Sequence, residues 1–144
     1  MRYQLLKIVL DTSCVFSGLY SSLGASHQIP SLVAKGVIVP ILSNPLIYEY
    51  EAVLKRKHEE LGLSLDEIDQ FLNGICAAGV QKEVSFMWRP QLKDADDEHI
   101  LELAVVSEAK VIVTHNVRDF FGAEKFGVTI YQPSEFLTYW RKLK

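Results

Sequence analysis

Apolar residues recur along the chain in two patterns, which together predict strands that alternate with helices. Short runs rich in β-branched residues predict buried strands, and they occupy residues 7–10, 37–42, 111–114 and 128–131. Apolar residues at helical spacing predict helices over residues 26–36, 44–57, 64–78 and 133–140 and after residue 94. This alternation is typical of an α/β fold, a three-layer α/β/α sandwich with a mostly parallel central sheet.

Capping signals place the beginnings of several of these helices. Ser64 is followed three residues later by Glu67, which predicts a capping box. Asn44 before Pro45 predicts a cap followed by a first-turn proline. Ser26 is expected to cap the first of the predicted helices.

Glycine, serine and proline modify the pattern elsewhere. The Gly- and Ser-rich stretch 17–25 is expected to form a loop or a short first turn. Pro40 predicts that the second strand is short or lies at an edge of the sheet. Residues 80–87 are ambiguous between a short strand and a loop.

Composition adds the expectation of one soluble, cytoplasmic domain over residues 1–144. Half of the residues (49%) are hydrophobic, which supplies a full core. Cys14 and Cys76 form no Cys-x-x-Cys pair, which suits a reducing compartment, and Cys14 is expected to be a small core residue. No stretch approaches the roughly 20 apolar residues of a membrane helix. The net charge of −3 gives no general attraction to nucleic acid, so such binding needs a local patch or a bound cation.

Acidic residues stand at positions where a carboxylate needs an explanation. Asp11 ends the first predicted strand, at the edge where open α/β sheets bind ligands. Glu49 and Asp97 each lie on the apolar stripe of a predicted helix, where an unpaired carboxylate is costly. Simpler explanations remain open: Asp11 can cap a helix, Glu49 can reach solvent or pair with a lysine, and Asp97 can belong to a helix start.

A further polar group follows the strand at 111–114. Thr114 ends that strand, and Asn116 and Asp119 follow it, although Asn116 can also make a turn and Asp119 can cap a short helix. In a parallel sheet Asp11 and residues 114–119 emerge at the same carboxyl edge. Carboxylates gathered there raise one another's pKa unless a cation neutralises them, and oxygen ligands favour Mg²⁺ or Mn²⁺.

These segments resemble the PIN-domain family of metal-dependent ribonucleases, in particular the toxins of bacterial toxin–antitoxin pairs of the VapC type. The resemblance covers almost the whole chain and rests on four motifs, Ile-Val-Leu-Asp-Thr-Ser at 8–13 and the segments 42–49, 94–101 and 113–120. It implies a ribonuclease that prefers single-stranded RNA and uses Mg²⁺ or Mn²⁺. It also implies a protein antitoxin as partner and a homodimer or higher oligomer.

The resemblance also implies roles for individual residues. Asp11, Glu49 and Asp97 would be the metal-binding, catalytic acids, with either Asp94 or Asp96 as a possible substitute for Asp97. Asp119 would be a fourth acid or would support the others. Ser13 and Thr114 would orient carboxylates through their hydroxyls. Asn116 departs from those relatives that have aspartate at this position, which puts a second metal site in doubt.

Basic residues suggest where RNA would bind. Lys55, Arg56, Lys57 and Arg118 are the expected phosphate contacts, although a solvated helix end favoured by the helix dipole is the better explanation of the run at 55–58.

Two other functions fit the same residues, a PIN-type RNA-processing nuclease that is not a toxin, and a non-catalytic module whose acidic pocket binds a basic peptide. His99 and His115 are expected to have peripheral polar roles, because sites for hard ions rarely need imidazole.

Overall fold

We describe a computed structural model of the chain, covering residues 6–21, 24–84, 92, 95–107 and 109–143. The seven helices among these residues are α1 Thr12–Tyr20, α2 Ala25–Ala34, α3 Asn44–Arg56, α4 His58–Leu61, α5 Leu65–Ala78, α6 Glu98–Val106 and α7 Pro133–Lys142. The strands are β1 Leu6–Leu10, β2 Ile38–Leu42, β3 Val80–Gln81, β4 Val111–Val113 and β5 Thr129–Tyr131. Three short 3₁₀ helices cover Ala95–Asp97, Val117–Phe120 and Ala123–Phe126.

The strands form one parallel sheet in the order β3-β2-β1-β4-β5, so β1 lies in the middle. Strand β1 pairs with β2 on one side and with β4 on the other, where Leu10 lies opposite Val113. The Asp11 N–H continues this ladder by donating to the Val113 carbonyl oxygen at 2.9 Å. The chain therefore places Asp11 at the centre of the carboxyl edge of the sheet.

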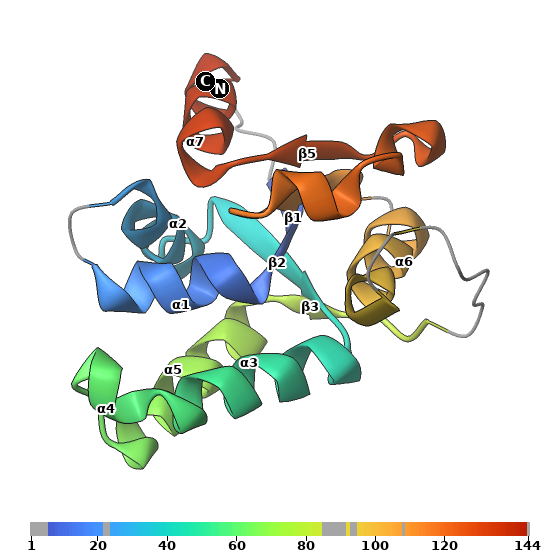
Figure 1. Cartoon of the computed structure of the whole chain (residues 1–144). Coiled ribbons are helices and arrows are strands. Elements are labelled where there is room, and N and C mark those ends of the chain that lie inside the picture. Colours follow the sequence, from blue (N-terminus) through green and yellow to red (C-terminus); the bar gives the residue numbers. More distant parts are fainter. Residues whose placement is uncertain (1–5, 22–23, 85–91, 93–94, 108, 144) are drawn as a thin grey trace.

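Helices cover both faces of this sheet, with α1 and α2 on one side and α6 on the other (Figure 1). Strands β1 and β4 are buried over Ile8–Leu10 and Val111–Val113, as expected for strands covered on both faces. Cys14 lies in the core with 1% of its surface exposed. The predicted α/β/α sandwich with a parallel sheet is confirmed.

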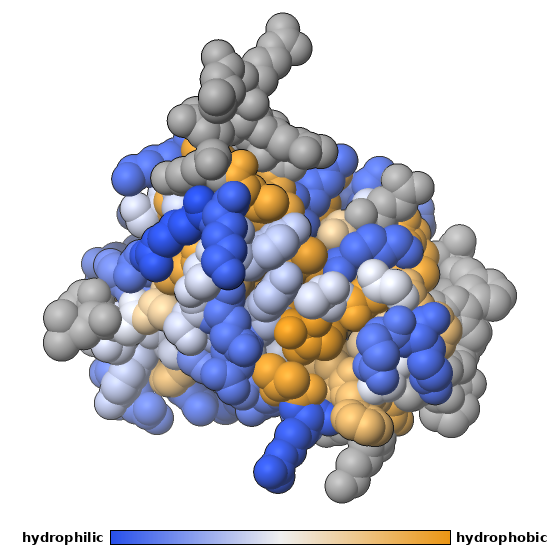
Figure 2. All heavy atoms as spheres, turned by 90° about the horizontal axis from the view of Figure 1, so that it is seen from above, coloured by the Kyte–Doolittle hydropathy of each residue, from blue (hydrophilic) through white to orange (hydrophobic). Residues whose placement is uncertain are grey.

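The edge strands of the sheet are β3 and β5. Strand β5 lies on the face shown in Figure 2, where apolar and polar side chains are interspersed. The most exposed large apolar side chain among the described residues, Phe121, precedes this strand. None of the described helices combines the length and the apolar content needed to cross a lipid bilayer.

Pro40 does not mark a sheet edge, because β2 lies between β1 and β3. Nor is β2 short, because its five residues match β1 and exceed the two or three residues of β3, β4 and β5. The pairing with β3 begins only at Ile41, opposite Val80, so the missing N–H of Pro40 precedes that short ladder. Because β3 is only two residues long and pairs beyond Pro40, a proline is tolerated inside the sheet. The ambiguous segment 80–87 contains this strand in its first two residues, and residues 85–87 lie outside the described ranges.

The prediction of a loop over 17–25 is wrong for its first four residues, which belong to α1. Gly18 in α1 is buried, and a Cβ at this position would lie 2.9 Å from the Ser26 carbonyl oxygen in α2. Glycine at residue 18 therefore allows the two helices to approach closely. The composition that predicted a loop serves a helix–helix contact instead.

The predicted caps are partly correct. Ser64 and Glu67 form the expected capping box at the start of α5. The cap of α3 is Ser43, one residue before Asn44, and its Oγ accepts from the Leu46 N–H at 3.3 Å. The cap of α2 is Gly24 rather than Ser26, and Gly24 has no side chain to accept a hydrogen bond.

Candidate active site

Asp11 is the buried carboxylate around which the polar residues of the carboxyl edge are arranged. Its side chain is the N-cap of α1, and Oδ1 accepts from the Thr12 N–H at 2.9 Å. Oδ2 accepts from the Thr114 hydroxyl at 2.6 Å and from the Ser13 hydroxyl at 3.1 Å. With both oxygens held, the carboxylate has a defined orientation although only 6% of the residue is exposed.

The pKa of Asp11 is nevertheless raised above its usual value. Burial is the largest cause, because it penalises the charged form, and the negative charge of Glu49 adds to it. The hydrogen bonds from Thr114, Ser13 and the Thr12 N–H act in the opposite direction and only partly compensate. Ionised Asp11 therefore carries a negative charge that its surroundings do not fully balance.

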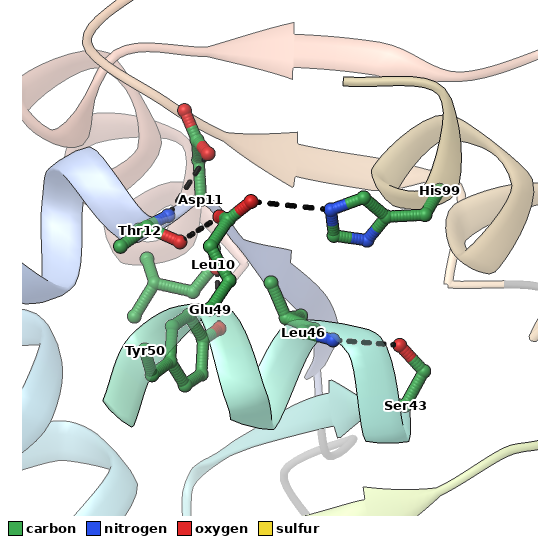
Figure 3. A network of polar contacts seen from close by, with 8 residues as sticks. All are labelled: Leu10, Asp11, Thr12, Ser43, Leu46, Glu49, Tyr50 and His99. Carbon is green, nitrogen blue, oxygen red and sulfur yellow. Dashed lines mark hydrogen bonds and ion pairs between the residues drawn. The ribbon is translucent and has the colours of Figure 1, made fainter. Parts of the chain in front are cut away.

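Glu49, in the middle of α3, is the second carboxylate of the site. Its Oε2 accepts a hydrogen bond from the Thr12 hydroxyl, and its Oε1 lies 3.2 Å from Nε2 of His99 in α6 (Figure 3). Burial alone would raise the pKa of Glu49, but the contacts with His99 and Thr12 outweigh it and lower the pKa. The surroundings of Glu49 therefore favour its ionised form, whereas those of Asp11 on balance disfavour it.

His99 lies in the site rather than at its periphery, so the expectation of a peripheral role is wrong. Its ring joins α6 to α3 through Glu49, and 17% of its side chain is exposed. The other ring nitrogen, Nδ1, is buried without a hydrogen-bond partner in the described part of the chain. His99 also borders a cavity of about 560 Å³ between the start of α3 and the end of β3.

A buried tyrosine holds α3 against β1 beneath these carboxylates. Tyr50 is 1% exposed, and its hydroxyl donates to the Leu10 carbonyl oxygen, one residue before Asp11. This contact joins the residue after Glu49 to the residue before Asp11 (Figure 3). It explains how two carboxylates 38 positions apart in the sequence come to share one site.

The residues directly after β4 form hydrogen bonds around Asp11. Thr114 is completely buried, and its Oγ1 both donates to Asp11 and accepts from the Asn116 N–H at 2.9 Å. Ser13 accepts from the His115 N–H at 3.3 Å while it donates to Asp11. Asn116 thus contributes its backbone to this network, and its side chain is exposed.

The structure does not gather the four predicted acids into one cluster. No group of three or more His, Cys, Asp or Glu side chains within the described ranges is close enough together to hold a metal ion. Asp97 is the N-cap residue of α6, two positions before His99, and is half-buried. Asp119 is half-buried in the 3₁₀ helix after β4, where its N–H donates to the Asn116 carbonyl oxygen at 2.9 Å. Asp96 is exposed next to Asp97, and Asp94 lies outside the described residues.

Comparison with known protein families decides the family. The profile described as PIN domain matches residues 7–118, which is most of the chain. The chain belongs to the PIN-domain family. No curated protein and no solved structure matches it. PIN domains are generally nucleases and typically use divalent metal ions.

The donor atoms of this PIN domain suit a hard divalent cation. Asp11 and Glu49 offer carboxylate oxygens, and the threonine and serine hydroxyls beside them add only oxygen. Mg²⁺ and Mn²⁺ prefer such ligands to nitrogen or sulfur. The uncompensated charge of Asp11 is the feature that such a cation would neutralise.

Of the four basic residues predicted to bind RNA, two have partners within this PIN domain and two are exposed. Lys55 forms ion pairs with Glu51 at 3.1 Å and Asp69 at 2.8 Å. The Lys57 ammonium lies 4.8 Å from the centre of the Phe16 ring. Arg56 and Arg118 are exposed.

Proposed function

We propose that this PIN domain is an endoribonuclease that requires Mg²⁺ or Mn²⁺ and prefers single-stranded RNA. The observation that carries the proposal is the buried Asp11 carboxylate at the carboxyl edge of the sheet, oriented by three hydrogen-bond donors. A divalent cation bound there would activate water and hold the phosphodiester.

The roles of the surrounding residues follow from their contacts. Thr114 and Ser13 keep the Asp11 carboxylate in place, and Thr12 and His99 do the same for Glu49. Asp97, at the start of the helix that carries His99, and Asp119, in the 3₁₀ helix after β4, would join the ligand set only if the cation draws them toward Asp11 and Glu49, because the structure does not bring these four acids together.

The substrate contacts and partners extend the proposal. Arg118, in the 3₁₀ helix after β4, lies four positions after Thr114 and would contact RNA phosphates. Lys55, Arg56 and Lys57 at the end of α3 would form a more distant contact. We further propose that the protein is a cytoplasmic toxin, that it acts as a homodimer or higher oligomer, and that an antitoxin neutralises it by inserting a basic side chain between the carboxylates.

Cleavage of a labelled single-stranded RNA with Mg²⁺, Mn²⁺ or EDTA tests the activity. We expect cleavage with either ion, none with EDTA, and none from Asp11→Asn. Asparagine is as good a helix cap as aspartate, so α1 should be retained in this variant. Asp66→Asn, in the exposed first turn of α5, is the matched control and should cleave normally. Cleavage by Asp11→Asn at the wild-type rate would refute the assignment.

Thermal unfolding tests the metal site independently of activity. A cation that binds only the folded state stabilises it by about 2.7 kcal/mol at 100 times its Kd. We therefore expect Mn²⁺ to raise the Tm of the wild type and of Asp66→Asn but not that of Asp11→Asn. An equal rise in all three proteins would place the cation elsewhere.

Two results would favour the other roles of this fold. RNA cleavage without growth arrest on expression in bacteria would indicate a processing nuclease rather than a toxin. Binding of an arginine-rich peptide without any cleavage would indicate a non-catalytic binding module.

A further inference from the structure

The cavity of about 560 Å³ beside His99 is lined by polar side chains to which the proposed reaction gives no role. It lies between the start of α3 and the end of β3, and the His99 ring in its lining contacts Glu49 of the candidate active site (Figure 3). Small-molecule sites are commonly clefts of about 300–1,000 Å³. The cavity therefore has the size of a ligand site and borders the place of the proposed reaction.

Two side-chain amides from different elements meet in this lining. Gln81, in β3, donates a hydrogen bond from Nε2 to Oδ1 of Asn44, the first residue of α3. The NH₂ group of Asn44 and the side-chain carbonyl of Gln81 have no other partner among the described residues, and both side chains are exposed. If the two amides exchanged roles, one NH₂ group and one carbonyl would still remain. The pair thus presents a hydrogen-bond donor beside an acceptor.

The other side chains of the lining are of mixed character. Oγ of Ser43 accepts from a backbone N–H of α3, so its own hydrogen can be donated to a ligand. Lys82 brings an ammonium group that forms no ion pair with a described carboxylate, and Glu83 brings a carboxylate. Pro45 and Val84 add apolar surface. Such a lining suits a flat molecule that carries its own donors and acceptors better than a bare cation or anion.

We propose that this cavity binds one nucleobase of the RNA, next to the phosphate that is cleaved. The inference rests on the proposed ribonuclease function for the identity of the ligand. The Asn44 NH₂ would donate to a ring nitrogen of the base, and the Gln81 carbonyl would accept from its exocyclic amino group. Bases splayed out of single-stranded RNA are recognised by hydrogen bonds to these edges. Lys82 would contact the phosphate of the same nucleotide.

The donor–acceptor pair predicts which bases are preferred. Adenine and cytosine each carry an amino group next to an unprotonated ring nitrogen, which matches the pair. Uracil and guanine have a carbonyl oxygen in the position of that amino group, where the Gln81 carbonyl and the Glu83 carboxylate would repel it. A mismatch of this kind costs about 1–3 kcal/mol, so we expect a preference of at least about tenfold for adenine or cytosine.

Nucleotide binding in EDTA tests the site without any catalysis. We expect AMP and CMP to produce saturating ¹H–¹⁵N shifts in the side-chain amides of Asn44 and Gln81, UMP and GMP to bind about tenfold more weakly, and ribose 5-phosphate to leave these amides unchanged. Asn44→Ala and Gln81→Ala should each weaken AMP binding about three- to tenfold, the effect of losing one hydrogen bond. Asn73→Ala and Gln70→Ala, at exposed positions of α5, are the matched controls and should bind AMP normally. Equal affinity for AMP and UMP, or equal AMP binding by the wild type and all four variants, would overturn the proposal.

The contact between Lys82 and the phosphate has its own test. Lys82→Gln should weaken the binding of AMP and leave that of adenosine unchanged, because only AMP carries a phosphate. Equal weakening for both ligands, or none for either, would overturn this contact.

Cleavage kinetics distinguish this inference from the proposed function. If the cavity selects the base, the wild type should cleave oligoadenylate with about tenfold higher kcat/KM than oligouridylate, and Asn44→Ala and Gln81→Ala should reduce this ratio toward one. An unchanged ratio in both variants of an active enzyme would refute the base subsite alone. Base-selective nucleotide binding by a protein that cleaves no RNA would refute the ribonuclease alone.

Discussion

The Thr114 hydroxyl should contribute strongly to folding stability, because it is the buried partner of the Asp11 carboxylate. The Thr114→Val substitution keeps the shape of the side chain but removes the bond to Asp11 Oδ2 and the one from the Asn116 N–H. A hydrogen bond to a charged group contributes about 1.5–3 kcal/mol and a neutral one about 0.5–1.5 kcal/mol. We therefore expect the free energy of unfolding to fall by about 2–4 kcal/mol.

Urea unfolding at pH 7 in EDTA, followed by circular dichroism, measures this loss. With an m-value of about 2 kcal/mol per M, the unfolding midpoint should fall by about 1–2 M. Thr114→Ser keeps the hydroxyl and should recover most of the loss. Thr129→Val makes the same substitution at an exposed residue of β5 and should change the midpoint little.

The Asp11→Asn background separates the bond to the carboxylate from packing. An amide oxygen is a weaker acceptor than a carboxylate, so Thr114→Val should cost about 1 kcal/mol less in this background. An equal loss in both backgrounds would refute the reasoning, because the cost would then not depend on the charge of Asp11. A loss no larger than that of Thr129→Val would refute it as well.

Three further predictions concern charge, packing and reactivity. In EDTA, Asp11→Asn should become more stabilising relative to the wild type as the pH rises from 3 to 7, because the raised pKa of Asp11 gives the wild type stability at low pH that is lost when Asp11 ionises. Glu49→Gln should become more destabilising over the same range, because the lowered pKa of Glu49 gives the wild type stability that is lost as the pH falls. Urea midpoints measure both pH dependences, and pH dependences of the same sign in the two variants would contradict us. Gly79→Ala should lower the midpoint, since its Cβ would lie 2.6 Å from a backbone oxygen of β2, whereas Gly74→Ala in the interior of α5 has open space and should gain up to about 1 kcal/mol. Burial raises the pKa of Cys14 to about 12. The exposed Cys76 should therefore react with Ellman's reagent in the folded protein, and the buried Cys14 only after unfolding.

The parts of the fold that the sequence predicts well are those encoded locally. The Ser64–Glu67 capping box needs only residues three positions apart, and the end of α5 at Ala78 is followed by the expected Gly79. The central strands are apolar runs whose burial on both faces follows from composition. Such features require no knowledge of the rest of the chain.

The end of α1 could not be predicted in this way, because it depends on contact with the start of α2. Gly18 and Ser17 are weak helix formers and predict a turn by propensity. In the structure Gly18 provides the space for the Ser26 carbonyl oxygen, and Ser17 contacts His115. Tertiary contacts therefore override the local preference at these positions.

The candidate site was predictable where it follows from strand order and unpredictable where helices meet. Asp11 and Thr114 end adjacent parallel strands, so their contact follows from topology. His99 reaches Glu49 only because α6 packs near α3, and nothing in its own segment indicates this partner. Glu98 lies on the same helix with 1% exposure, and its Oε1 accepts the Leu92 N–H at 2.8 Å, a buried contact that periodicity alone does not reveal.

The two carboxylates of the site are treated differently, and this difference bears on how RNA could approach. His99 and Thr12 hold Glu49 ionised, whereas burial and the charge of Glu49 itself disfavour ionised Asp11. A phosphate that approached both carboxylates directly would add a third negative charge to a site that already lacks compensation. On the proposed function, a cation at Asp11 removes this repulsion for the scissile phosphate.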